Sequence, residues 1–246
     1  MRRARERPWR QVPWLLWLLL GLGLLGQIGS ALQRPPHAAR ATALTALPAT
    51  DVLRVFALGE PALAARVLML WLQAQDHQPG LSLPYAALDY ARVEAWLARL
   101  LELDARFDYP LLAASRLYGE VAEPNRQHRM IAFIARAFAE DPAARWRWQA
   151  HAVYLAQHRL RDLPLALGLA QQLAAAPGGA TIPSWARQMH IFVLENMGEL
   201  DSARVVLGGL LESGALVDAH ERAFLARRLR ELEAAVQSAP SPASKE

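Results

Sequence analysis

The chain from residue 143 onward consists of helix-length segments joined by short connections, and this pattern is the strongest constraint on its fold. Helices are expected at 143–159, 163–175, 184–197, 200–213 and 218–236. Ala and Leu dominate, Val and Ile are sparse, and only 8% of the residues are aromatic. Such a composition favours helix, because unbranched side chains lose little rotamer freedom there. Helices with short connections pack as antiparallel neighbours, so the sequence predicts an all-α fold.

Two of the connections have similar sequences. Residues 196–204 read NMGELDSAR, and residues 161–166 read RDLPLA. Both resemble the turn of a tetratricopeptide repeat, in which a small Ala, here Ala166 or Ala203, occupies a close helix crossing. The spacing between these two Ala residues slightly exceeds the ~34 residues of the standard repeat, and the excess falls in residues 177–183. The resemblance covers roughly residues 86–236 and implies a TPR-like α-solenoid domain over 51–237.

Helices are also expected before residue 143, where Gly and Pro mark their limits. The segments are 51–58, 61–75, 86–103, 110–121 and 124–140. Gly59 ends the first segment, and Pro61 suits the first turn of the second. Residues 33–50 contain Pro35 and Pro36 with little periodicity and are expected to be a linker, and residues 238–246 are expected to be a disordered tail.

Positive charge precedes an apolar run at the N-terminus. Five arginines and Glu6 in residues 1–10 account for the formal net charge of +4, so the rest of the chain is neutral by subtraction. Residues 12–32 are almost all apolar, and about 20 helical residues match the ~30 Å hydrocarbon core. We expect residues 1–11 to be a cytoplasmic basic tail and 12–32 a transmembrane signal-anchor. The positive-inside rule then places the remaining chain outside the cytoplasm, on a single-pass protein of the bacterial inner membrane.

Other interpretations of residues 12–32 remain open. A cleaved secretory signal would use Gly29 and Ala31 as the recognition pair. The anchor is favoured because the apolar run is long for a signal core, and both interpretations place the folded part across the membrane. A buried core helix is disfavoured by the preceding arginines and by the absence of a polar face.

Residue types needed for most chemistry are missing or scattered. The chain has no cysteine, which excludes thiol catalysis, disulfides and thiolate metal sites. His151 and His158 share a helix face but have no third ligand nearby, and Gly178-Gly179 lacks the Lys-Ser/Thr of a phosphate loop. The neutral charge of the folded part disfavours nucleic-acid binding. We therefore expect no enzyme, cofactor, metal or nucleic acid.

A protein partner is the expected ligand, because a repeat stack presents a concave surface formed by the first helix of each pair. That surface is suited to a peptide or to a helix of another protein. Counting back from Ala166 and Ala203 places these residues on it: Trp148, His151, Leu155, His158, Arg159, Trp185, Gln188, Phe192, Glu195 and Asn196.

Residues 145–149, RWRWQ, have two interpretations. Alternating Arg and Trp form a ligand ledge in one. In the other, which is favoured, Trp146 fills the space between helices, Trp148 covers a neighbouring helix, and both arginines point to water.

The resemblance implies a membrane-anchored extracytoplasmic adaptor in a bacterial envelope assembly. The alternative is a structural spacer in a larger membrane complex, held mainly through its transmembrane helix. A degenerate helical enzyme domain is a third possibility, disfavoured by the missing catalytic residues.

Overall fold

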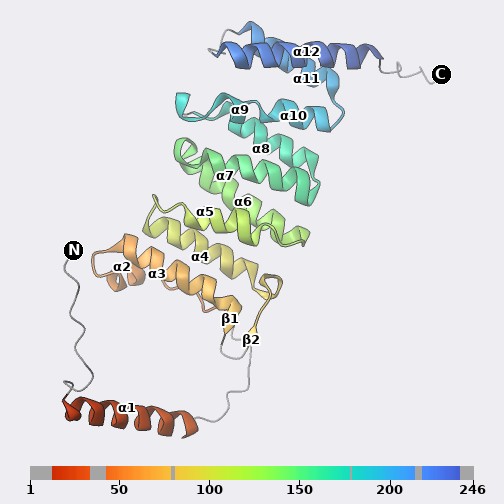
Figure 1. The fold of residues 1–246 in the computed structure, drawn as a ribbon. Helices are drawn as coiled ribbons and strands as arrows, with labels where there is room; N and C mark the ends of the chain where they lie inside the picture. The colour runs from red at the N-terminus through yellow and green to blue at the C-terminus, as the bar shows by residue number, and fades with distance from the viewer. Residues whose placement is uncertain (1–12, 34–42, 79–80, 178, 214–217, 239–246) are drawn as a thin grey trace. The chain divides into compact units, whose positions relative to one another are not determined.

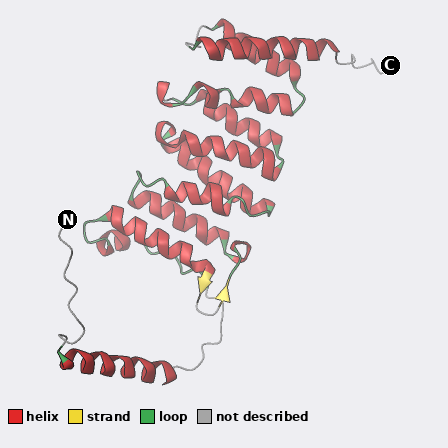
Figure 2. Ribbon diagram, viewed as in Figure 1, coloured by secondary structure: helices red, strands yellow, loops and turns green. Residues whose placement is uncertain are grey.

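The computed structural model describes residues 13–33, 43–78, 81–177, 179–213 and 218–238 and divides the chain into two units (Figure 1). The first unit is 1–42 with 78–82, and the second is 43–77 with 83–246. The described residues are mainly helical (Figure 2). Two short strands, β1 (His77–Gln78) and β2 (Leu81–Ser82), pair with each other. The prediction of an all-α protein is confirmed.

Helix α1 (Trp14–Gln33) is the 20-residue helix of the first unit. Its Leu, Ile and Trp side chains are exposed on all sides of the helix. Among the described residues, no single helix is both long and apolar enough to qualify as a membrane span. Helices α2 (Thr50–Phe56) and α3 (Pro61–Gln73), which are bent by 106° at their junction, qualify by length and composition only when taken together.

The second unit contains the helices that the sequence pattern predicts, with limits that differ by a few residues. After α2 and α3, its longer elements are α4 (Tyr90–Leu103), α5 (Tyr109–Ala113), η4 (Ala114–Tyr118), α6 (Pro124–Glu140), α7 (Pro142–Tyr154), η5 (Leu155–Leu160), α8 (Leu163–Ala175), α9 (Ser184–Arg187), α10 (Met189–Asn196), α11 (Leu200–Glu212) and α12 (Ala219–Ser238). Single 3₁₀ turns form at η2 (Ala74–Asp76), η3 (Tyr85–Ala87) and η6 (Gly179–Thr181). The segments η4 and η5 are π-helical continuations of α5 and α7.

Aspartate caps determine where three of these helices begin. The side chain of Asp89 accepts a hydrogen bond from the backbone N–H of Ala91 at 3.0 Å, so α4 starts at residue 90 and not at the predicted residue 86. Asp141 caps α7 and Asp162 caps α8 in the same way. An acidic N-cap satisfies one of the free N–H groups of the first turn and complements the helix dipole.

The two similar turns have the same local structure. Gly198 adopts φ +79°, and the next helix begins two residues later at Leu200. Arg161 adopts φ 60°, and α8 likewise begins two residues later. Ala166 and Ala203 are therefore both the fourth residue of their helices, and both are completely buried. A close helix crossing requires both Ala residues to be buried, and both are.

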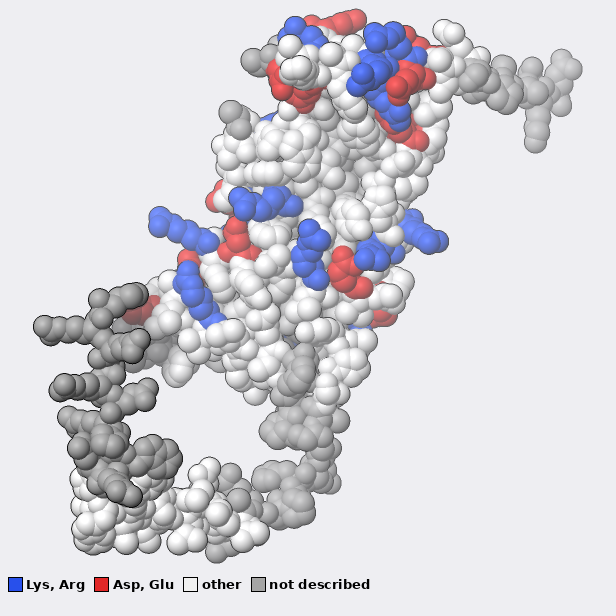
Figure 3. Space-filling model, in the orientation of Figure 1, with Lys and Arg blue, Asp and Glu red and all other residues white. Residues whose placement is uncertain are grey.

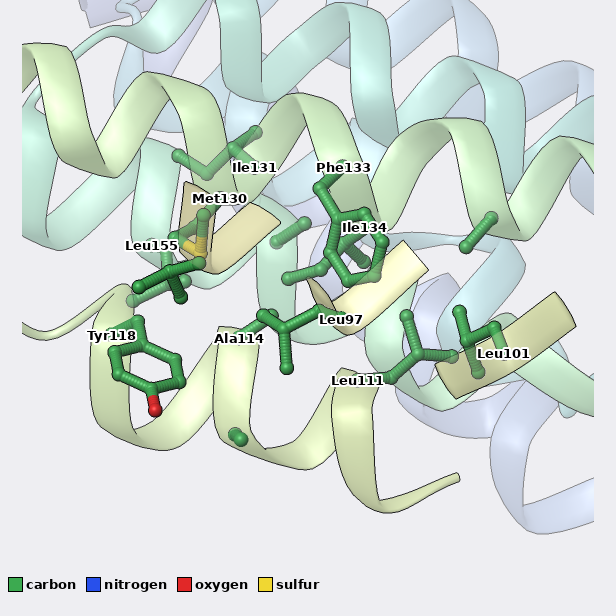
Figure 4. Packing of buried hydrophobic residues seen from close by; sticks show 14 of the residues in the cluster. Leu97, Leu101, Leu111, Ala114, Tyr118, Met130, Ile131, Phe133, Ile134 and Leu155 are labelled. Atoms are coloured by element: carbon green, nitrogen blue, oxygen red, sulfur yellow. The ribbon is translucent and has the colours of Figure 1, made fainter. Parts of the chain in front are cut away.

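Helices of the second unit pack mainly against their neighbours along the chain. In order, α3 contacts α4, α4 contacts α6, α6 contacts η4 and α7, α7 contacts α8, α8 contacts α10, α10 contacts α11, and α11 contacts α12. Figure 4 shows one core section, which contains Leu97 of α4, Leu111 of α5 and Ile134 of α6. On the face shown in Figure 3, basic and acidic side chains of this unit lie intermixed.

Candidate functional site

One open hollow of about 440 Å³ is formed by residues of four helical elements, η4, α7, α9 and α10. Helix α7 contacts both η4 and α9, which brings these elements together. We call it the basic-aromatic hollow, and its lining residues are Arg116 from η4, Arg147, Ala150, His151 and Tyr154 from α7, Trp185 from α9 and Met189 from α10.

Aromatic rings form much of the surface in and beside this hollow. The ring of Trp146 meets that of Trp185 edge to face, with centroids 5.5 Å apart. Tyr154 stacks on His151 at 5.4 Å and lies 4.8 Å from His158 one turn further along. Trp185 and Tyr154 are both exposed. Rigid rings that remain exposed offer contact area to a ligand at low conformational-entropy cost.

Two arginines give the hollow its positive charge. Arg116 and Arg147 are exposed, and among the described residues no ion pair to a carboxylate is found for either. Neighbouring arginines differ: Arg159 pairs with Glu120 at 2.7 Å, and Arg145 pairs with Glu140 at 2.8 Å. The hollow therefore presents two guanidinium groups that are free to bind an anion.

The surroundings of His151 disfavour its charged form. Burial lowers the pKa of this imidazole, and the nearby Arg116 charge lowers it further, against opposing effects of Glu120 and a backbone hydrogen bond at Ser115. Its Nε2 atom is buried and has no hydrogen-bond partner in the described structure, and the same holds for Nε1 of Trp148. The His151 ring, stacked on Tyr154, forms a polar wall of the hollow.

The structure distributes the ten residues predicted for the concave surface over several environments. His151 and Trp185 line the hollow, and Trp148 lies nearby, partly buried against the main core. Leu155 is 0% exposed and packs in the core section of Figure 4, and Gln188 is also buried. These two side chains therefore offer no surface to a ligand.

The remaining predicted residues lie outside the hollow. His158, Arg159 and Asn196 are exposed and Phe192 is half-buried. Glu195 accepts hydrogen bonds from Nε of Arg228 at 3.1 and 3.2 Å, so this carboxylate connects α10 to α12. Gln188 has a similar role, because its Nε2 donates to Glu221 of α12 at 2.7 Å.

Sequence reasoning missed Arg116, Arg147, Ala150, Tyr154 and Met189 of the hollow. Positions were counted at α-helical spacing from Ala166, whereas the π-helical η5 changes the rotation of α7 relative to that reference. The spacing of His151, Tyr154 and His158 was the available signal, because these rings lie at three and four residue steps on one helix face.

The RWRWQ cluster combines features of both interpretations. Trp148 packs against the core as the favoured one requires, and Arg147 is exposed. The prediction that both arginines point to water is wrong for Arg145, which is 4% exposed and donates to the carbonyl of Ala137 at 2.7 Å. Trp146 is only partly buried and meets Trp185 edge to face at the edge of the hollow.

These observations define an all-α protein whose second unit packs its helices largely in chain order and carries an open basic and aromatic hollow. Within the described residues, no group of three or more acidic or histidine side chains is arranged to hold a metal ion. No protein-family model, curated protein or solved structure matches the chain.

Proposed function

We propose that this chain is a membrane-anchored, extracytoplasmic adaptor of the tetratricopeptide type, in which an α-solenoid over residues 51–237 binds a segment of another protein in a bacterial envelope assembly. Two features support the solenoid. Consecutive helices pack on one another, as in repeat stacks. The turns at Arg161 and Gly198 place Ala166 and Ala203 at equivalent buried positions.

The basic-aromatic hollow is the single observation that carries the adaptor function. Arg116 and Arg147 are two guanidinium groups without a carboxylate partner among the described residues, and guanidinium forks bind carboxylates strongly. Trp185 and Met189 beside them offer a surface for an apolar side chain. The partner we infer is a peptide segment that combines carboxylates with an apolar or aromatic residue.

Anchoring by residues 12–32 is part of the proposal. Helix α1 has 20 residues, of which Trp14–Ser30 form the apolar part, and its Leu, Ile and Trp side chains are exposed. At 1.5 Å per residue such a helix is about 30 Å long, close to the thickness of the hydrocarbon core. With Arg2 to Arg10 in the cytoplasm, a reporter that is active only outside the cytoplasm should work when fused after Glu246. Activity of a cytoplasm-only reporter at that position would show the opposite topology.

Peptide binding tests the adaptor function directly. Fluorescence anisotropy would measure the affinity of the full chain, in nanodiscs, for a library of acidic peptides with and without an aromatic residue. Arg116→Gln and Arg147→Gln should each weaken binding by about tenfold or more, because a hydrogen bond to a charged group contributes ~1.5–3 kcal/mol. Arg230→Gln is the control, since Arg230 is an exposed arginine of α12 outside the hollow.

Two results would argue against an adaptor that uses this hollow. Equal affinities for wild type and both hollow variants would place binding elsewhere. An absence of peptide binding across the library, combined with stable membrane association, would favour the structural spacer held through α1.

A further inference from the structure

Helices α2 and α3 expose a set of apolar side chains at the N-terminal end of the second unit. We call this surface the α2–α3 face, and it consists of Val52, Val55, Phe56, Leu58, Leu63, Val67 and Leu70. Leu58 is 90% exposed and Leu70 is 67% exposed. Apolar surfaces of this kind mark contact sites with proteins or membranes.

The exposed side of α3 is opposite a side that already packs in the core. Ala65, Met69 and Leu72 are buried in the main cluster, whereas Leu63, Val67 and Leu70 lie at i, i+4 and i+7 on the other side. A helix that is apolar all round is usually buried on every side. On α3, the α2–α3 face is therefore the side that no described part of the chain covers.

The geometry points to lipid as the cover: we propose that the α2–α3 face lies in the interface of the same membrane that holds α1. This contact presupposes the anchor of the proposed function. Helix α1 ends at Gln33, and the following chain is already fixed to the second unit at Leu44, which is buried. Its carbonyl accepts a hydrogen bond from Arg92, and the Thr45 carbonyl accepts one from Nε1 of Trp96 at 3.1 Å.

Chain length then limits how far α2 and α3 can lie from the membrane. Only residues 34–43 connect the two fixed points, and at ~3.3–3.6 Å per residue they reach on the order of 35 Å. A short tether keeps its attached module at a high effective concentration relative to the surface that anchors it. Lipid therefore has an advantage over a second copy or a free partner as the occupant of the α2–α3 face.

The shape of the helix pair suits a helix hairpin lying in the interface. Helix α3 has 13 residues, so it is about 20 Å long and too short to cross the bilayer alone. Leu58 and Gly59 both have positive φ values, and they turn the chain through the 106° bend between the helices. Two short apolar helices at this angle can both lie near the plane of the membrane.

Charge distribution distinguishes this contact from electrostatic membrane binding. The pair carries Asp51, Arg54, Glu60 and Arg66, which is formally neutral, and Arg54 pairs with Asp51 at 3.5 Å. Apolar area, and not attraction to anionic headgroups, must then drive the insertion. Contact of the α2–α3 face with lipid should therefore be the same in zwitterionic and in partly anionic vesicles, and it should resist salt.

Site-specific fluorescence in the full chain tests the proposal. The chain has no cysteine, so Leu70→Cys and Ser202→Cys each provide one labelling site for an NBD fluorophore after reconstitution into phosphatidylcholine vesicles. Ser202 is an exposed residue of α11 and serves as the control. We expect nitroxide-labelled lipid to quench the fluorophore at residue 70 several-fold more than that at residue 202, and aqueous iodide to show the reverse order.

Each alternative gives a different result. Iodide access at residue 70 without lipid quenching, on protein that still floats with the vesicles, would overturn the lipid contact and leave the anchor intact. Self-quenching that grows with the protein-to-lipid ratio, again without lipid quenching, would identify a second copy as the occupant. Protein that does not float with the vesicles would instead contradict the anchor itself.

Discussion

Ala203 illustrates how a single small residue sets the distance between two helices. It is completely buried in a cluster with Leu207 of its own helix and Leu225 and Leu232 of α12. Ala203→Leu introduces extra methylenes into packed space, and overpacking costs about 1–3 kcal/mol. Leu is nearly as good a helix former as Ala, so helix propensity contributes little to that loss.

Thermal unfolding of the full chain in mild detergent should therefore show a clear decrease in Tm for Ala203→Leu. Ser202→Leu, at the neighbouring exposed position, is the control and should change Tm little. Equal melting temperatures for Ala203→Leu and wild type would remove the packing role of this residue and the main residue-level support for the repeat.

Two partly buried histidines make the stability of the fold depend on pH. Burial lowers the pKa of both His151 and His190 below the ordinary value of 6.5, although each also has a backbone hydrogen bond that opposes the shift. The folded state then binds fewer protons than the unfolded state, so stability is fully present above the unfolded pKa and is lost as the pH falls through the folded pKa.

Melting temperature should accordingly decrease between about pH 7.5 and about pH 5.5, the range around the ordinary histidine pKa of ~6.5. The double variant His151→Gln/His190→Gln should have a shallower decrease, because neither side chain can then take up a proton. His220→Gln, at an exposed position, is the control. An unchanged slope in the double variant would assign the acid sensitivity to other groups.

At the level of helices and turns, the sequence was most informative about helix starts, because the residues that determine them lie within one turn of the helix end. Pro61 and Pro124 lie at the helix starts that were predicted from them, and the caps Asp141 and Asp162 lie directly before the observed starts of α7 and α8. Such signals act within one turn, because they depend on the free N–H groups of the helix end and on the fixed φ of proline.

Helix rotation could not be predicted in the same way. The π-helical segments η4 and η5 both contact α6, and α9, which ends at the break of the predicted helix 184–197, contacts α7 and α8. Gln188 is buried and donates to Glu221 of α12, a residue 33 positions away. Without these contacts, spacing from Ala166 placed Leu155 on the surface, and it missed Arg116, which belongs to an element further upstream.

The ion pair between α10 and α12 gives a prediction at this scale. The Glu195 side chain is 8% exposed and that of Arg228 is 38% exposed. Removal of Arg228 leaves a nearly buried carboxylate without compensation, a change that costs ~3–5 kcal/mol in a fully buried pair. Because solvent screens the partly exposed arginine, Arg228→Leu should cost less, about 1–3 kcal/mol.

Hydrogen exchange would locate that loss. Faster exchange in α12 than in α7 is expected for Arg228→Leu, and the double variant Glu195→Leu/Arg228→Leu should recover part of the protection. Arg230→Leu, at an exposed position of the same helix, is the control. Uniform acceleration along the chain would show that α12 does not open separately.

For the whole molecule, the proposed adaptor and the structural spacer assign different roles to α1, which is only an anchor in the first and the binding element in the second. Replacing residues 12–32 by an unrelated apolar helix of the same length, with Arg2 to Arg10 retained, keeps the anchor and changes only its side-chain surface. If binding resides in the basic-aromatic hollow, acidic peptides should bind the chimaera as tightly as the wild type, and cross-linking in cells should recover the same partners. A structural spacer that recognises its complex through α1 would lose those partners in the chimaera although its folded unit is unchanged.

The chimaera that also carries Arg116→Gln completes the test, because an adaptor loses its partners through that single change whichever helix crosses the membrane.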